Sequence, residues 1–325
     1  MRALLCEAYG PPQSLTVVDL PDPAAGAGEV LVEVIAAGLN FFDTLLIRGK
    51  YQVRPEPPFS PGGELVGRVI GHGPGVDAPA IGTRVVAYST YGACRERIAL
   101  PASSVVPVPD GISDEAAAGL LITYGTTYHA LKDRARLQRG ETLVVLGASG
   151  GVGLAAVELG KAMGARVIAC ATSEEKLASA MAHGADDGVN YGTGDLKAAL
   201  KAHGGATGID VVYDPVGGEL AEAALRSLGW KGRFLVIGFA SGTIPKMPLN
   251  LALLKGCDIL GVFWGRSIEE EPDGHRANVA ELLALCETGK LKTRIDSVLS
   301  LDEAPLGLEK LSDRKAVGKI IVRID

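Results

Sequence analysis

Residues 143–176 constrain the fold of this chain more than any other stretch. They read LVVLGASGGVGLAAVELGKAMGARVIACATSEEK. A short apolar run leads into a glycine-rich turn, an apolar pattern at helical spacing continues to Gly164, and a second apolar run follows at 167–170. A buried strand, a tight turn, a helix and a second strand make up the βαβ unit whose helix N-terminus binds dinucleotides.

Three glycines stand in this turn at regular spacing, namely Gly147, Gly150 and Gly153. Glycine lets the chain turn without a Cβ penalty, brings backbone N–H groups against a pyrophosphate and allows the helix to pack closely on the sheet. Such a trio alone also fits a flexible loop or a helix–sheet contact without a ligand. Because a strand precedes the glycines and a helix and a second strand follow them, we predict a dinucleotide site.

The residues after the second strand bear on which dinucleotide binds. An NAD site usually places an acidic residue there to hold the ribose 2′-OH. Here the strand runs into Ser173, with Lys176 one turn further on, and both side chains suit a 2′-phosphate. We therefore expect NADPH as the cofactor, with NADH less favoured. The alternative is that Ser173 and the two acids after it form an ordinary helix start, in which case Glu174 could reach a ribose.

Length and composition describe a globular chain of about two domains. Of the 325 residues, 47% are apolar and 22% are charged, and the net charge is −6. Because no basic run of the usual length occurs, nucleic acid is an improbable partner. The sequence has no uninterrupted apolar stretch long enough to span a membrane, and its N-terminal residues do not resemble a secretory signal, so we expect a cytoplasmic protein. The five cysteines show no metal-binding spacing.

The pattern of apolar residues changes twice along the chain. Residues 1–122 carry short strand-like segments punctuated by glycine and proline, as in a small twisted barrel. Residues 123–263 alternate strand and helix patterns, with six strands that fit a doubly wound parallel sheet. The tail, 264–325, is expected to return to the first domain. The predicted fold is therefore α/β, with a barrel-type catalytic domain (1–122 and 264–325) and a dinucleotide-binding domain (123–263).

This domain order resembles the medium-chain dehydrogenase/reductase superfamily, whose catalytic domain is GroES-like and whose second domain is a Rossmann fold. Within it, the chain is similar to the zinc-free, zeta-crystallin-like NADPH:quinone oxidoreductases over nearly its whole length. Several short sequence motifs, separated along the chain, match those of the family in the same order, which argues against chance agreement. They are Asn40 to Asp43 (N-x-x-D), Arg48 to Tyr51 (R-x-x-Y), Pro61 to Glu64 (P-G-x-E), Thr126 to Tyr128 (T-x-Y), 147–153 (GASGGVG), 189–191 (VNY) and Gly318-Lys319.

The resemblance implies which residues bind the cofactor. Those expected to hold the pyrophosphate are Ser149, Gly150, Gly151 and Val152. Those expected to surround the adenosine ribose and its 2′-phosphate are Ser173, Lys176 and Tyr191. Those expected to line the nicotinamide side are Gly238, Phe239, Ser241, Phe263, Trp264 and Gly265, together with Asn40 and Thr126. Lys319 and Arg314 are weaker cofactor candidates.

The superfamily's alcohol dehydrogenases use a catalytic zinc, which needs about three protein ligands. By resemblance, Asn40 stands where their first zinc cysteine would be, and the glycine pair 62–63 stands where the histidine would be. Only Glu64 remains as a ligand. A neutral amide and two glycines cannot hold the metal, so we expect an enzyme without zinc.

Without a Lewis acid, hydride transfer should favour acceptors that are already electrophilic, such as quinones or carbonyl-conjugated alkenes. Oriented hydrogen-bond donors would then stabilise the developing oxyanion. Asn40 and Tyr51 are the candidate catalytic donors. Alternatively, Asn40 only orders the loop that follows it, and Tyr51 is an aromatic wall without proton chemistry. Asp43 is expected to cap a helix or turn. The five histidines, His72 and His129 among them, stand in no recognisable dyad in the sequence, so we assign them no role.

Two other functions remain open from the sequence. One is the reduction of a 2-enoyl-CoA thioester of the acrylyl or crotonyl type, which uses the same chemistry. The other, from a different class, is an NADPH-binding structural or RNA-binding protein, which the resemblance to zeta-crystallin suggests as an alternative. By resemblance the chain is also expected to form a homodimer through its last predicted parallel strand, 258–263.

Overall fold

The computed structural model describes residues 1–324, which divide into two compact units. The first unit holds residues 1–122, 279–288 and the part from 293 onward, and the second holds 123–278 and 289–292. Helices α3 (Leu121–Tyr128) and α10 (Pro272–Glu287) carry the chain from one unit to the other.

The first unit is built mainly of antiparallel strands. Its strands are β1 (Arg2–Leu5), β2 (Thr16–Asp19), β3 (Glu29–Leu39), β4 (Glu64–His72), β5 (Arg84–Tyr88), β6 (Arg97–Pro101), β7 (Val105–Pro107), β14 (Ile295–Leu299) and β15 (Lys319–Arg323). They form a seven-stranded sheet of order β14-β15-β3-β4-β5-β7, with β6 paired to β3, and a separate β1-β2 pair. Its short helices are η1 (Pro12–Ser14), α1 (Phe41–Leu46), η2 (Ala102–Ser104), α2 (Asp114–Ala118) and α11 (Ala304–Ser312).

Strand β3 is the longest strand of the seven-stranded sheet, and its burial pattern and pairing explain why this sheet is curved. Val32 and Val34 are buried while Glu33 between them is exposed, which is the alternation of a strand with one face on a core. Its pairing with β4 shifts register at two places, and such bulges bend a strand and increase its twist. The result is the curved, barrel-type sheet that the sequence predicted.

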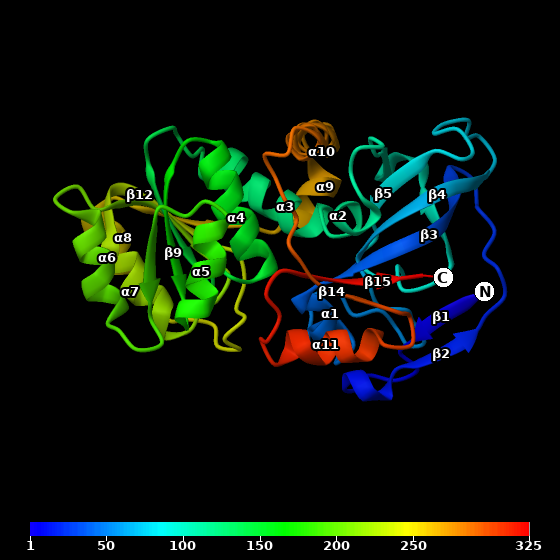
Figure 1. The fold of residues 1–325 in the computed structure, drawn as a ribbon, viewed down its shortest axis with the longest axis horizontal. Helices are drawn as coiled ribbons and strands as arrows, with labels where there is room; N and C mark the ends of the chain where they lie inside the picture. The colour runs from blue at the N-terminus through cyan, green and yellow to red at the C-terminus, as the bar shows by residue number, and fades with distance from the viewer. Residues whose placement is uncertain (325) are drawn as a thin grey trace. The chain divides into compact units, whose positions relative to one another are not determined.

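The second unit is a parallel sheet with helices on both faces (Figure 1). Its strands are β8 (Thr142–Leu146), β9 (Arg166–Ala171), β10 (Asp187–Asn190), β11 (Ile209–Asp214), β12 (Leu228–Val236) and β13 (Asp258–Gly261). Its helices are η3 (His129–Arg134), α4 (Gly151–Ala162), α5 (Glu174–Ala182), α6 (Leu196–Gly204), α7 (Glu219–Ser227), α8 (Leu249–Lys255) and α9 (Trp264–Glu270).

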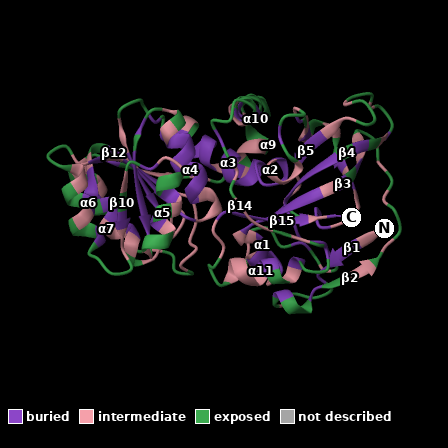
Figure 2. Ribbon diagram, viewed as in Figure 1, coloured by how far each residue is buried: buried purple, intermediate pink, exposed green. Residues whose placement is uncertain are grey.

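The strand order of this sheet is β10-β9-β8-β11-β12-β13. The chain therefore starts in the middle, builds one half outward, and returns to build the other half, which is the order of a doubly wound dinucleotide-binding fold. The three central strands, β9, β8 and β11, are buried along nearly their whole length (Figure 2), as their continuous apolar runs require. The predicted six-stranded parallel sheet is confirmed.

Two segments lie in a different unit from the one we predicted. Residues 289–292 and, before them, 264–278 were assigned to the barrel-type domain, but both belong to the second unit. The reason is side-chain packing: the Trp264 indole lies directly against Gly125, and Asn278 Nδ2 donates a hydrogen bond of 2.8 Å to Asp133 Oδ2. These contacts hold the start of α10 on the second unit.

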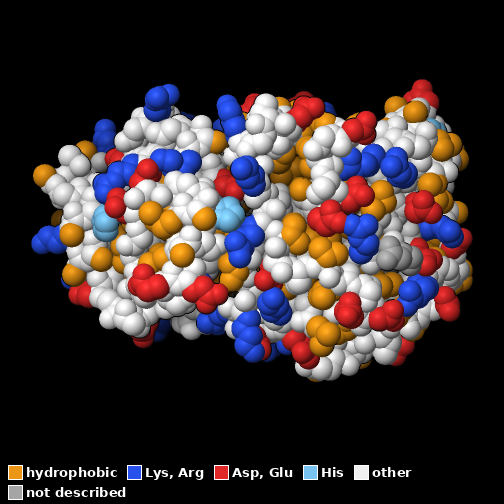
Figure 3. All heavy atoms as spheres, in the orientation of Figure 1, with side chains coloured by type: hydrophobic (Ala, Val, Ile, Leu, Met, Phe, Trp, Pro, Cys, Tyr) orange, Lys and Arg blue, Asp and Glu red, His pale blue; other side chains and the backbone are white. Residues whose placement is uncertain are grey.

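Two observations concern the surface. On the face drawn in Figure 3, acidic and basic side chains are interspersed with apolar ones rather than gathered by sign.

Within residues 1–324, none of the helices combines the length and the apolar character that crossing a membrane requires.

Candidate functional site

The glycine-rich turn between β8 and α4 has the conformation of a phosphate cradle. Gly147 adopts a φ of +60°, and a Cβ at Gly153 would lie 2.2 Å from the Gly147 carbonyl oxygen, so both positions require glycine. Gly150 caps α4 and donates its N–H to Gly147 O at 3.1 Å. The first N–H groups of α4 have no acceptor within the helix and carry the positive end of its dipole. This turn therefore fits a pyrophosphate, next to Ser149, which is buried.

The turn after β9 places Ser173 and Lys176 together. Ser173 is the N-cap of α5 and accepts a hydrogen bond from Lys176 N at 3.4 Å, so the helix start expected as the alternative is present. The Lys176 ammonium donates to Thr172 Oγ1 at 3.3 Å and so folds back over the same turn. A hydroxyl and an ammonium group thus lie at the carboxyl end of β9, where the ribose of a dinucleotide binds in this fold.

Tyr191 follows β10, the neighbour of β9. Its backbone N–H donates to Ala171 O at 2.9 Å, so the residue lies beside the turn that carries Ser173. Its half-buried ring packs against the core of the second unit. The structure therefore brings Ser173, Lys176 and Tyr191 together, as we predicted for the ribose side.

Gly238, Phe239 and Ser241 follow β12 and are half-buried. Their loop is tied to the loop after β11, since Ser241 N donates to Val216 O at 2.8 Å. The loop after β11 is held in place by Asp214, whose Oδ1 accepts hydrogen bonds from the N–H groups of residues 216 and 217 at 2.8 Å each. Burial raises the pKa of this carboxyl. We did not predict a role for Asp214, although an acid closing an apolar strand is a visible signal.

The remaining predicted nicotinamide-side residues of this unit lie in two different settings. Phe263 is 52% exposed, whereas Trp264 is 6% exposed, with its indole against Gly125 and edge-on to His275 at 5.6 Å between ring centroids. Trp264 is thus a packing residue of α9. The two smaller members of the set, Thr126 in α3 and Gly265 in α9, are half-buried.

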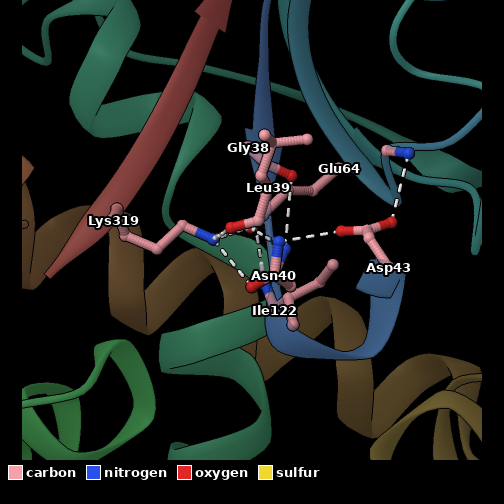
Figure 4. A network of polar contacts seen from close by, with 8 residues as sticks. Gly38, Leu39, Asn40, Asp43, Glu64, Ile122 and Lys319 are labelled. Atoms are coloured by element: carbon pink, nitrogen blue, oxygen red, sulfur yellow. Dashed lines mark hydrogen bonds and ion pairs between the residues drawn. The ribbon is translucent and has the colours of Figure 1, made fainter. Parts of the chain in front are cut away.

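In the first unit, a buried ion pair joins β4 to β15 (Figure 4). The Lys319 ammonium donates to Glu64 Oε1 at 2.7 Å, to Asn40 Oδ1 at 2.7 Å and to Leu39 O at 3.0 Å. The side chains of Lys319 and Glu64 are 4% and 1% exposed. All three N–H groups of Lys319 have acceptors inside this unit, so its role in the structure is to neutralise Glu64.

Asn40 belongs to the same network. Its Nδ2 donates to Glu64 Oε1 at 2.9 Å and to Gly38 O at 3.2 Å, while its Oδ1 accepts from Lys319. The other oxygen of Glu64 accepts from Ile122 N at 2.9 Å. Both amide protons of Asn40 are therefore occupied, and the side chain orders its own loop, which is the alternative that the sequence left open.

Asp43 is the third residue of helix α1, whose N-cap is Asn40. Its two carboxylate oxygens accept from Asn40 N at 2.8 Å and from Gly62 N at 3.1 Å. The capping role expected from the sequence is confirmed. Burial raises the pKa of Asp43 to about 7, against the opposing effects of these two N–H donors and of Lys319.

Tyr51 lies beyond the turn that ends α1. Its ring packs against Phe42, with 5.1 Å between ring centroids, and the residue is half-buried. Burial raises the pKa of Tyr51 to about 12, with smaller contributions from Tyr88 and Asp43. The phenol therefore stays protonated at neutral pH and can donate a hydrogen bond.

One histidine pairs with an acid in a way that we did not recognise in the sequence. His129 Nδ1 lies 2.9 Å from Asp133 Oδ2, and Asn278 Nδ2 donates to the same oxygen. The spacing of four residues within one helical segment was the available signal. The pair fastens the start of α10 within the second unit.

Potential metal ligands do not converge in the part of the chain that the structure describes. Among residues 1–324, no group of three or more histidine, cysteine, aspartate or glutamate side chains could hold a metal ion. Glu64 is the acid at the zinc position suggested by resemblance. Its Oε1 accepts hydrogen bonds from Lys319 and Asn40, and its Oε2 accepts one from Ile122 N.

Comparisons with known proteins agree with this architecture. A family model described as the alcohol dehydrogenase GroES-like domain matches residues 26–110, and one described as zinc-binding dehydrogenase matches 151–283. The chain is 36% identical to quinone oxidoreductase-like protein 2 of Rattus norvegicus, over 99% of this chain and 92% of the rat protein. It is 32% identical to acryloyl-coenzyme A reductase of Metallosphaera sedula, over 99% of each.

A solved structure gives the same result. The quinone oxidoreductase of Escherichia coli in complex with NADPH matches with a TM-score of 0.93 and 29% identity, over 99% of this chain and 100% of the other. A GroES-like domain joined to a Rossmann domain with a glycine-rich phosphate turn defines a medium-chain dehydrogenase/reductase. Within that superfamily, the chain belongs to the quinone oxidoreductase family of oxidoreductases.

Proposed function

We propose that this protein reduces a quinone or a carbonyl-conjugated alkene with NADPH and without zinc. The observation that carries the cofactor assignment is the turn after β9, where Ser173 and Lys176 lie side by side. NADPH, when bound, supplies a hydride from its nicotinamide ring. The cradle of 147–153 would hold the pyrophosphate, and Ser173, Lys176 and Tyr191 would hold the 2′-phosphate. The NADPH complex of the related Escherichia coli enzyme supports this assignment.

The network around Lys319 supports a mechanism without zinc. Glu64, the one acid left at the position of the superfamily's catalytic zinc, is saturated by hydrogen bonds and paired with an ammonium group. A carboxylate so occupied is a poor metal ligand. The acceptor must then be electrophilic by itself, which favours quinones and enones.

Tyr51 is the donor that we propose for the oxygen of the acceptor. Its phenol stays protonated well above neutral pH, and a hydrogen bond from it would stabilise the developing oxyanion. Asn40 has no free amide proton in the structure, so we assign it the supporting role of ordering the chain between β3 and Tyr51.

The test is NADPH oxidation by the purified, chelator-treated protein with 1,4-benzoquinone, a simple enone or crotonyl-CoA as acceptor. We expect turnover with the quinone or the enone that chelation does not reduce. The Tyr51→Phe variant should lose about ten- to a hundredfold in kcat if the phenol stabilises the oxyanion. Activity that disappears with chelation would contradict the zinc-free mechanism, and unchanged kcat in Tyr51→Phe would contradict the role of Tyr51.

Reduction of an enoyl-CoA is the second candidate function. It is favoured by the 32% identity to an acryloyl-coenzyme A reductase over 99% of both chains. The chemistry is the same, since a thioester-conjugated alkene is also an electrophilic acceptor. Turnover with crotonyl-CoA alone in the same assay would select this function over the first.

Lys176 should decide the preference for NADPH. The Lys176→Ala variant is expected to bind NADPH about ten- to a hundredfold more weakly, because one cation that pairs with the 2′-phosphate is lost. Binding of NADH, which lacks this phosphate, should change less than about twofold. Titration of both cofactors by isothermal calorimetry measures the two affinities. Equal weakening of both would show that Lys176 does not contact the phosphate.

We further propose a homodimer formed through β13 and α8. Among residues 1–324, strand β13 pairs with β12 alone and so leaves one edge of the sheet unpaired. Beside it, Leu249, Leu253 and Leu254 of α8 are 72%, 81% and 70% exposed, and Trp230, which packs against Gly256 at the end of α8, is 71% exposed. A second copy of the same chain would cover this apolar surface through a twofold axis.

A charge on this surface should separate the subunits. The Leu253→Asp variant is expected to sediment as a monomer where the wild type sediments as a dimer, because the aspartate would be buried without a partner. The matched control is Leu306→Asp on α11, which is 58% exposed but lies in the other unit. A wild-type protein that is monomeric at micromolar concentration would contradict the proposal.

The cysteines suit a reducing compartment such as the cytosol. All five are free, and four of them are buried.

A further inference from the structure

An acidic residue stands beside the proposed 2′-phosphate site, and the structure shows how its charge is held. Glu174 is the first residue of α5, immediately after Ser173, and is exposed. Its Oε1 accepts a hydrogen bond of 2.7 Å from Asn190 Nδ2. Asn190 is the last residue of β10, paired with Ala171 at the end of β9. The Glu174 carboxylate is thus fastened toward β10.

The orientation of Asn190 is itself determined by its surroundings. Its Oδ1 accepts a hydrogen bond of 3.0 Å from Gly192 N, which leaves Nδ2 to face Glu174. The position of Gly192 is restricted in turn, because a Cβ there would lie 2.3 Å from the Thr172 carbonyl oxygen. The turn after β10 therefore packs directly on the end of β9, and the amide of Asn190 can direct only its N–H groups toward α5.

We propose that Asn190 is a specificity-determining residue, which selects NADPH by holding the Glu174 carboxylate away from the 2′-phosphate subsite of Ser173 and Lys176. This inference rests on the proposed NADPH-dependent function. A carboxylate released at this place would repel the phosphate dianion, and it could accept a hydrogen bond from the 2′-OH of NADH, as acidic residues at the end of this strand do in NAD-binding folds. Asn190 would thus act on cofactor choice through Glu174, without touching the cofactor.

The experiment is a double-mutant cycle on cofactor binding, which needs no turnover. Dissociation constants for NADPH and NADH are measured calorimetrically for the wild type, Asn190→Ala, Glu174→Gln and the double variant. We expect Asn190→Ala to bind NADPH about three- to tenfold more weakly and NADH no more weakly than the wild type. Glu174→Gln alone should change NADPH binding less than about twofold, and the double variant should match Glu174→Gln within about twofold.

Weakening of NADPH binding in the double variant equal to that in Asn190→Ala would overturn the inference, because Asn190 would then act only by shaping the Gly192 turn. Asn190→Asp is a second variant that tests the inference if the alanine variant does not fold. It keeps an acceptor for Gly192 N but removes the donor to Glu174. It should weaken NADPH binding at least as much as Asn190→Ala, and wild-type affinity in Asn190→Asp would also overturn the inference. The wild-type preference for NADPH over NADH tests the proposed function separately, whatever the coupling between Asn190 and Glu174.

Discussion

A Lys319→Met variant is expected to lose about 3–5 kcal/mol of the free energy of unfolding, because the substitution leaves the Glu64 carboxylate buried without its counter-charge. The Glu64 side chain is 1% exposed, and its remaining donors are the Asn40 amide and one backbone N–H. Both tryptophans, Trp230 and Trp264, lie in the second unit, so tryptophan fluorescence would report on the unfolding of that unit and not of the first. Amide hydrogen exchange of β3 and β15 is therefore the measurement that reports the loss in the first unit.

Two further variants separate the buried charge from lost packing. Lys319→Met combined with Glu64→Gln removes both charges and should recover more than half of the lost stability. Lys315→Met removes an exposed lysine whose ammonium lies 2.8 Å from Asp313, and it should leave exchange in β15 unchanged. If the double variant were as unstable as Lys319→Met, the loss would come from packing and not from the buried carboxylate.

A Gly153→Ala variant should bind NADPH at least about a hundredfold more weakly and lose about 1–3 kcal/mol of stability. The added Cβ would lie 2.2 Å from Gly147 O and 2.8 Å from Ala148 Cα, and both of these are backbone atoms. The helix or the turn must therefore move, and the N–H groups that would face the pyrophosphate move with it. Calorimetric titration with NADPH and thermal unfolding measure the two effects.

Gly150→Ala is the matched control for this variant. Gly150 has a φ of −75°, and its added Cβ would meet only Gly147 O, at 3.6 Å. Its stability should stay within about 1 kcal/mol of the wild type, because alanine is a poorer N-cap than glycine but lowers the conformational entropy of the unfolded chain. Equal destabilisation by the two alanines would show that the close approach of α4 to the turn is not what requires Gly153.

The parallel sheet could be predicted from the sequence because its determinants are local. Strands β8, β9 and β11 each contain a short apolar run, and each is followed by glycine, a cap or a helical pattern. The capping role of Asp43 was predictable for the same reason, since its partner Asn40 is three residues away. Where neighbouring residues determine a structure, spacing alone reveals it.

The polar network of the first unit could not be predicted in this way. Glu64 and Lys319 are 255 positions apart, and they meet because β15 pairs with β3, opposite Leu39 and its neighbours. Asn40 was predicted to be a hydrogen-bond donor for the substrate because its actual partners, Glu64 and Lys319, lie on two other strands far away in the sequence. The placement of residues 264–278 was wrong for a related reason, since the contact between Trp264 and Gly125 joins segments far apart in sequence.

The insertion of β15 between β14 and β3 also bears on the order of synthesis. All six strands of the second unit lie between residues 142 and 261, so a ribosome delivers that sheet as one continuous stretch. The sheet of the first unit is complete only when residues 319–323 have been made, although β3 and β4 precede the whole second unit. Glu64 therefore has no ammonium group to neutralise it while the whole sheet of the second unit is synthesised, and the sheet that contains β4 can be completed only after that one.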